Sequence, residues 1–74
     1  MDIFESTRIK LSNQGLRIDR YDLTRPWGGF FVLDENQAQA FADIYFEGLD
    51  VAPLRIAGKL SPKILLVKPE ARLS

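Results

Sequence analysis

Acidic and basic side chains supply most of the chemistry open to this 74-residue chain, which has ten of each. It has no histidine and no cysteine, so it lacks the commonest general base, the commonest metal ligand and the thiolate nucleophile. Two carboxylate pairs, Asp19 with Asp22 and Asp34 with Glu35, are close enough in sequence for acid–base work. Turns and helix starts also favour carboxylates, so we expect structural roles for both pairs.

Charge is unevenly distributed along the chain although the net charge is zero. Residues 34–50 carry five acids and no base, whereas residues 51–74 carry five bases and one acid. The bases are Arg55, Lys59, Lys63, Lys68 and Arg72. A basic segment of this kind could bind a phosphate, but solvated strand faces and turns give the same pattern. The pattern alone leaves both interpretations open.

Several functional classes are disfavoured. The chain has no glycine-rich phosphate loop, nucleophile elbow, metal-binding helix motif or calcium loop. Its aromatic residues do not follow an RNA-binding signature, so we expect no nucleic-acid partner. No apolar stretch reaches the roughly 20 residues that span a bilayer, and the acidic start, residues 1–5, lacks the features of a signal peptide. We expect a cytoplasmic protein without a membrane partner.

Residues 25–29, Arg-Pro-Trp-Gly-Gly, stand before an apolar run at 30–33. Proline biases Arg25 towards an extended conformation, and the two glycines permit backbone angles or close contacts that a side chain would forbid. Trp27 could pack over a sheet edge or form one wall of a ligand cleft. Arg25 and Trp27 are therefore candidates for substrate binding.

Alternation of apolar and polar residues at 7–11 and 16–20 predicts a hairpin with a turn at 12–15, although the first residues could instead form a short helix or a frayed end. A short apolar strand is expected at 30–33. Asp34 as N-cap, with Gln37 in a capping-box position, predicts a helix over 35–46 that ends near Gly48. Its apolar stripe is formed by Ala38, Phe41, Ala42 and Tyr45.

Beyond this helix, residues 47–61 read as turn and loop with a short strand or helical turn near 54–56. Residues 64–67 read as a strand buried on both faces. The expected fold is mainly β with one short helix. We divide it into an N-terminal arm or hairpin, 1–24, and the first strands and helix of a larger domain, 25–74, that is incomplete at its C-terminus.

Two blocks, residues 25–28 (Arg-Pro-Trp-Gly) and residues 63–74 (Lys-Ile-Leu-Leu-Val-Lys-Pro-Glu-Ala-Arg-Leu-Ser), resemble the cupin-type phosphomannose isomerases. Together they cover 16 of the 74 residues in the family's order. Glu70 departs from the glycine that family members often have after the proline.

The resemblance implies the N-terminal part of a jelly-roll β barrel that binds one divalent metal, usually zinc, and interconverts mannose 6-phosphate and fructose 6-phosphate. In the family, the metal ligands follow the Leu-Ser pair, here Leu73-Ser74, so this chain alone would be inactive. The expected partners are the remainder of the cupin chain and a sugar phosphate. The candidate substrate-binding residues are Arg25, Trp27, Lys63, Lys68 and Arg72.

Two alternatives remain open on the sequence. The chain could be a non-catalytic cupin or β-sandwich module that binds a sugar or a protein partner. It could also be a short stand-alone interaction protein that forms a homo-oligomer through unpaired strand edges and the apolar helix face.

Overall fold

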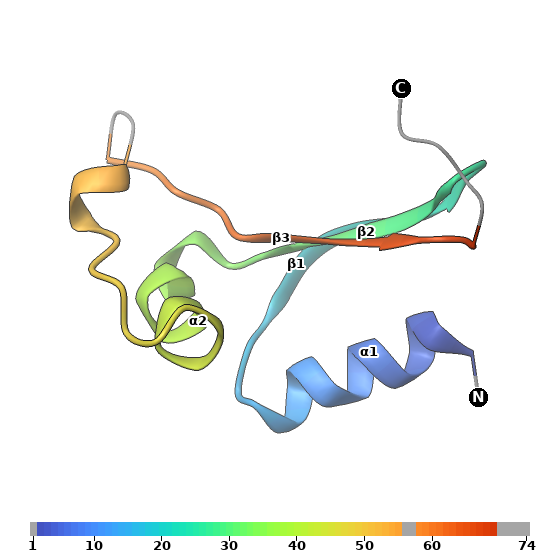
Figure 1. Ribbon diagram of the computed structural model, residues 1–74, viewed down its shortest axis with the longest axis horizontal. Coiled ribbons are helices and arrows are strands. Elements are labelled where there is room, and N and C mark those ends of the chain that lie inside the picture. Colours follow the sequence, from blue (N-terminus) through green and yellow to red (C-terminus); the bar gives the residue numbers. More distant parts are fainter. Residues whose placement is uncertain (1, 56–57, 70–74) are drawn as a thin grey trace.

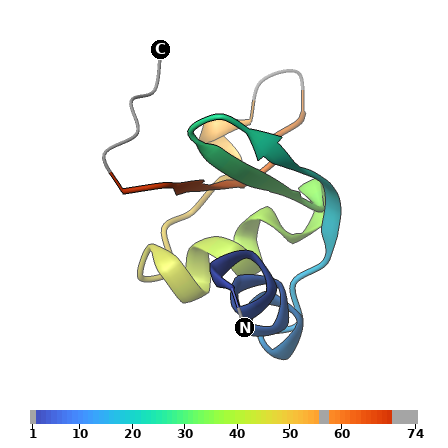
Figure 2. The ribbon, with the colours of Figure 1, turned by 90° about the vertical axis from the view of Figure 1, so that its right-hand side faces the viewer.

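The computed structural model describes residues 2–55 and 58–69. In this part, three strands form one antiparallel sheet in the order β1-β2-β3, with β2 in the centre. Figures 1 and 2 show both α-helices on the same side of this sheet. No helix of the described ranges is long and apolar enough to cross a membrane. The elements are α1 (Ile3–Asn13), β1 (Ile18–Arg25), β2 (Gly28–Leu33), α2 (Ala38–Tyr45) and β3 (Lys63–Val67), with short 3-10 turns η1 (Glu35–Gln37) and η2 (Ala52–Leu54).

The expectation of a mainly β fold with one short helix is wrong. The described chain is a small α/β arrangement in which helix is more extensive than strand. Its single three-stranded sheet also differs from the jelly-roll barrel that the resemblance implied.

Residues 7–11, expected as one arm of a hairpin, belong to α1. The Asp2 carboxylate accepts a hydrogen bond from the Glu5 amide at 2.8 Å, and Glu5 in turn pairs with Arg8. This Asp-x-x-Glu spacing is a helix-start signal that outweighs the short alternation after it. Gly15, at φ 77°, ends the helix, because the left-handed conformation there lets the Leu16 amide bond the Leu11 carbonyl at 3.0 Å.

The strand predicted at 30–33 is confirmed within β2, and the helix predicted at 35–46 is confirmed as η1 followed by α2. Asp34 caps this segment by accepting from the Asn36 amide at 2.9 Å. The capping-box role predicted for Gln37 is wrong. Its side chain instead accepts from the Arg17 amide at 2.6 Å and donates to the Gly15 carbonyl at 2.8 Å. It therefore ties the start of α2 to the turn before β1.

The main core lies between the sheet and the helices. Leu11, Leu16, Phe31 and Leu33 are at least 96% buried, and Phe41 of α2 packs against them. Ala38, Ala42 and Val51 form a second cluster beneath α2. The expected burial of β3 on both faces is wrong: Ile64 and Leu66 are half-buried, whereas Leu65 and Val67 are exposed. The helices cover only one face of the sheet, so every second residue of β3 is left uncovered.

The Arg-Pro-Trp-Gly-Gly stretch forms the tight turn between β1 and β2. Pro26 and Trp27 make the turn, and Gly28 begins β2 with φ 145°. A Cβ atom on Gly28 would lie 1.8 Å from the Leu66 carbonyl oxygen, and one on Gly29 would lie 2.6 Å from the Asp22 carbonyl oxygen. Both glycines are therefore required for β2 to pair closely with a strand on each side.

Gly28→Ala should lower the free energy of unfolding by about 2 kcal/mol or more, because the new methyl group must displace the β3 backbone as well as adopt a disfavoured φ. Gly58→Ala is the matched control, since Gly58 also has positive φ but meets nothing within 4 Å. Denaturant unfolding of both variants measures the difference. Equal losses would contradict the close approach of β2 and β3.

Stability should also depend on the charge of Asp34. The Asn36 amide, followed by Arg17, holds the pKa of this carboxyl below its ordinary value, against the effect of burial. A lowered folded-state pKa stabilises the fold fully above the unfolded pKa of about 3.9, and this stabilisation is lost as the pH falls through the folded value. The melting temperature of Asp34→Asn should therefore lie below that of the wild type at neutral pH, and the gap should close in acid. A gap that does not change between about pH 7 and about pH 3 would contradict this account.

Candidate functional site

The face of the sheet turned away from the helices collects basic side chains around an aromatic ring. Phe31 is buried on the helix side, so its neighbours Phe30 and Val32 point to the other face. Arg20 of β1, Val32 of β2 and Lys63 of β3 align as one row across the three strands. Val32 is only 5% exposed although no helix covers this face, because two long side chains flank it.

Phe30 lies at the centre of this face, and two cations approach its ring. The Lys63 ammonium lies 4.2 Å from the ring centroid and the Arg25 guanidinium carbon lies 5.7 Å from it. Each contact of this kind contributes about 0.5–1 kcal/mol when exposed. The ring thus holds two positive charges near each other, which favours an anion between them.

Among residues 2–55 and 58–69, one of the three cations on this face has a carboxylate partner. Asp22 pairs with Arg25 at 3.2 Å, and the Thr24 hydroxyl donates to the same carboxylate at 2.7 Å. The Thr24 contacts are the main cause that lowers the pKa of Asp22. Arg20 and Lys63 take part in none of the ion pairs of residues 2–55 and 58–69. These two charges are available to a ligand.

A shallow cavity of about 430 Å³ lies over this row. Its size is within the range of small-ligand sites. Its polar lining comes from Arg20, Asp22, Lys63 and the exposed Ser61, and its apolar wall from Phe30, Val32 and Tyr21. The Asp22 carboxylate is the one engaged by Arg25 and Thr24, so the cations still outnumber the acid at this cavity. We call this cavity and its flanking cations, Arg20, Arg25 and Lys63, the sheet-face site.

The predicted binding residues are only partly brought together. Arg25 and Lys63 meet on Phe30, as described above. Trp27 and Lys68 are neighbours at the hairpin end, where the Lys68 amide donates to the Trp27 carbonyl at 2.7 Å, but neither lines the cavity. Arg72 lies outside the described residues. Arg20 and Phe30 were missed, because the cross-strand register that brings them close to Lys63 joins segments more than 30 residues apart.

In each candidate acid–base pair, one carboxylate is held by hydrogen bonds and an ion pair that give it a structural role. Asp22 is held by Thr24 and Arg25, and Asp34 caps η1 and pairs with Arg17. Glu35 is half-buried in the first turn of η1, and Asp19 is exposed beside the groove described next. Neither pair forms a separate acid–base centre.

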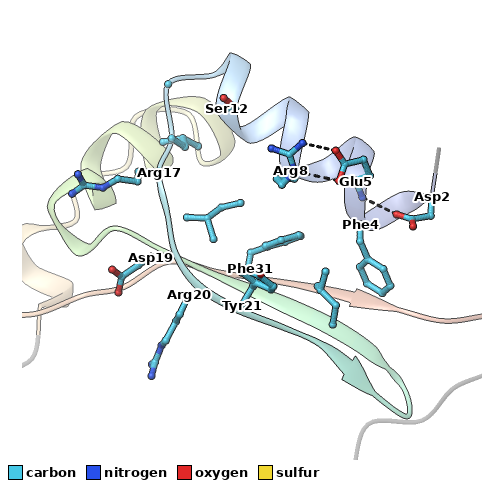
Figure 3. A pocket seen from close by; sticks show the side chains of 14 residues that line it. Asp2, Phe4, Glu5, Arg8, Ser12, Arg17, Asp19, Arg20, Tyr21 and Phe31 are labelled. Atoms are coloured by element: carbon cyan, nitrogen blue, oxygen red, sulfur yellow. Dashed lines mark hydrogen bonds and ion pairs between the residues drawn. The ribbon is translucent and has the colours of Figure 1, made fainter.

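A second, wider groove of about 1190 Å³ separates α1 from β1 (Figure 3). Phe4 and Phe31 point into it, while Arg8 and Glu5 form an ion pair along α1. Its lining mixes apolar side chains with charges of both signs. It therefore lacks the charge bias of the sheet-face site.

The chain's donors do not fit the metal that the resemblance implies. It has no histidine or cysteine. Residues 2–55 and 58–69 contain no group of three or more metal-ligating side chains. No protein-family model, curated protein or solved structure matches this chain.

The contact between Lys63 and Phe30 should be measurable as a coupling energy. A double-mutant cycle with Lys63→Met and Phe30→Leu should give about 0.5–1 kcal/mol in the free energy of unfolding, because the ring attracts the ammonium. A control cycle pairing Lys10→Met with Phe30→Leu should give none, since Lys10 lies on α1. Equal coupling in the two cycles would show that the cation does not sit on the ring.

Proposed function

We propose that this chain provides the phosphate-binding surface of a metal-dependent sugar-phosphate isomerase that interconverts mannose 6-phosphate and fructose 6-phosphate. The observation that carries the proposal is the meeting of the two resembling blocks. Residues 25–28 and 63–74 are far apart in sequence, yet Arg25 from one and Lys63 from the other lie on the same Phe30 ring. Gly28 also pairs directly with Val67 across β2 and β3.

The charges of the sheet-face site suit a phosphate monoester. Such a group carries a charge of about −1.5 to −2 at neutral pH and has three acceptor oxygens. Arg20 and Lys63, which form no ion pair with any residue that the structure describes, together supply two positive charges and several donors. Phe30 offers an apolar wall to the carbon face of the sugar. In this role the chain binds and orients the substrate through its phosphate.

The isomerisation chemistry is assigned to residues outside these 74. In the resembling family a divalent metal stabilises the charge on an enediol-like intermediate, and residues 2–55 and 58–69 hold no set of donors for it. Asp22 and Asp34 are bound by hydrogen bonds that favour their charged forms, which makes them poor general acids. The proposal includes a cytoplasmic location, where charged hexose phosphates are retained.

The alternative of a non-catalytic module that binds a sugar is favoured by this same lack of metal donors. Both proposals use the sheet-face site, but they differ in what a longer chain does. A longer form that converts mannose 6-phosphate and loses activity with a chelator supports the isomerase. A longer form that binds the sugar phosphate without converting it supports the module.

Calorimetric titration of the 74-residue chain with mannose 6-phosphate tests the shared step. Lys63→Gln should weaken binding at least about tenfold, because one charge-assisted hydrogen bond contributes about 1.5–3 kcal/mol. Lys10→Gln, which removes an exposed lysine on α1, should leave the affinity unchanged. Unphosphorylated mannose should not bind. If mannose binds as well as its phosphate, or if the two lysine variants weaken binding equally, the site is misplaced.

A further inference from the structure

The outer edge of β3 has the features of an interface. Among the residues that the structure describes, β3 pairs only with β2, so its other edge presents free backbone groups. Such edges recruit further strands unless they are blocked by bulges, charges or prolines. The proposal built on this edge is independent of the isomerase role.

The direction of the free groups follows from the ladder to β2. The Leu33 amide bonds the Pro62 carbonyl at 2.9 Å, and the Lys68 amide bonds the Trp27 carbonyl at 2.7 Å. Along an antiparallel strand, the backbone groups of successive residues point alternately to one neighbouring strand and to the other. The backbone groups of residues 62, 64, 66 and 68 therefore face β2. The amide and carbonyl groups of Lys63, Leu65 and Val67 therefore face outward.

The two edges of the sheet differ in how well they are protected. β1 has register irregularities on both sides of residues 20–22 and carries charges at Asp19, Arg20 and Asp22. β3 pairs with β2 in regular register, and its only charged residue is Lys63. The β3 edge is therefore the better template for another strand.

We propose that a second copy of this chain adds its β3 antiparallel to this edge, about a two-fold axis at Leu65, to form a continuous six-stranded sheet. This register places Leu65 opposite the partner's Leu65, and Lys63 opposite the partner's Val67. All three opposed pairs have outward-facing backbone groups, so each exchanges two hydrogen bonds. No like charges face each other directly, and the net charge of zero adds no overall repulsion between copies.

The side chains beside this edge are apolar and exposed. Leu65 and Val67 are 44% and 45% exposed on the uncovered face. An added strand would cover these side chains as well as satisfy the free backbone groups. A second copy is therefore a partner of suitable chemistry.

Sedimentation equilibrium of the 74-residue chain tests the proposal. The wild type should show twice the 8.4 kDa monomer mass. Leu65→Lys should weaken association at least tenfold, because it places two ammonium groups across the axis on an exposed position that the monomer tolerates. Tyr21→Lys, an exposed change on the opposite edge strand, should leave the dimer intact. Circular dichroism checks that both variants remain folded.

A cross-link tests the same register without relying on destabilisation. The chain has no cysteine, so Leu65→Cys introduces a single thiol. Opposed residues of a hydrogen-bonded antiparallel pair have Cα atoms about 5.5 Å apart, which a disulfide can span. Mild oxidation should link Leu65→Cys copies much faster than Tyr21→Cys copies.

Three results would overturn the proposal. One is a wild-type monomer over the whole concentration range, and another is a dimer that Leu65→Lys does not weaken. The third is a monomer in which the amides of Lys63, Leu65 and Val67 resist hydrogen exchange. That protection would show that another segment of the same chain covers the β3 edge.

Discussion

The close approach of β2 and β3 at Gly28 is the constraint on which the rest of the structure depends. β2 is the central strand, and the Leu66 carbonyl occupies the space that a side chain at position 28 would need. With glycine there, the strand pairs on both sides from its first residue. This pairing sets the register that aligns Arg20, Val32 and Lys63, and it brings Lys63 over Phe30. A backbone requirement therefore positions the charged site.

The helices cover only one face of the sheet, which leaves the other face open as a binding surface. Both helices lie on the face of the sheet that buries Phe31 and Leu33. Side-chain hydrogen bonds to the backbone hold them there; the Gln37 side chain, for example, bonds the turn before β1. The opposite face retains a half-buried ring, two cations without an ion-pair partner in the described part of the chain, and exposed aliphatic residues of β3. Buried unpaired charge would be costly, so these groups suit a surface that meets a ligand or another strand.

Where neighbouring residues all indicated the same element, the helix or strand was predicted correctly from the sequence. The features that were missed depend on conflicting local cues or on pairing between distant segments. Asp34, the apolar stripe of α2 and the run at 30–33 correctly predicted a helix and a strand. At residues 7–11 two cues conflicted, and the Asp2–Glu5 cap prevailed over a five-residue alternation. Gln37 had a plausible local partner but bonds a turn some 20 residues away. Arg25 and Lys63 were predicted for the site, whereas Arg20 depends on a three-strand register that no local pattern contains.

The central claim is that the uncovered face of the sheet is the binding surface for a phosphorylated sugar. Mapping amide chemical-shift changes during titration with mannose 6-phosphate tests it most directly, because each residue reports separately. The account predicts changes concentrated at Arg20, Arg25, Phe30, Ser61 and Lys63, and none when unphosphorylated mannose is added. Changes confined to the groove between α1 and β1, or identical changes with both sugars, would contradict it.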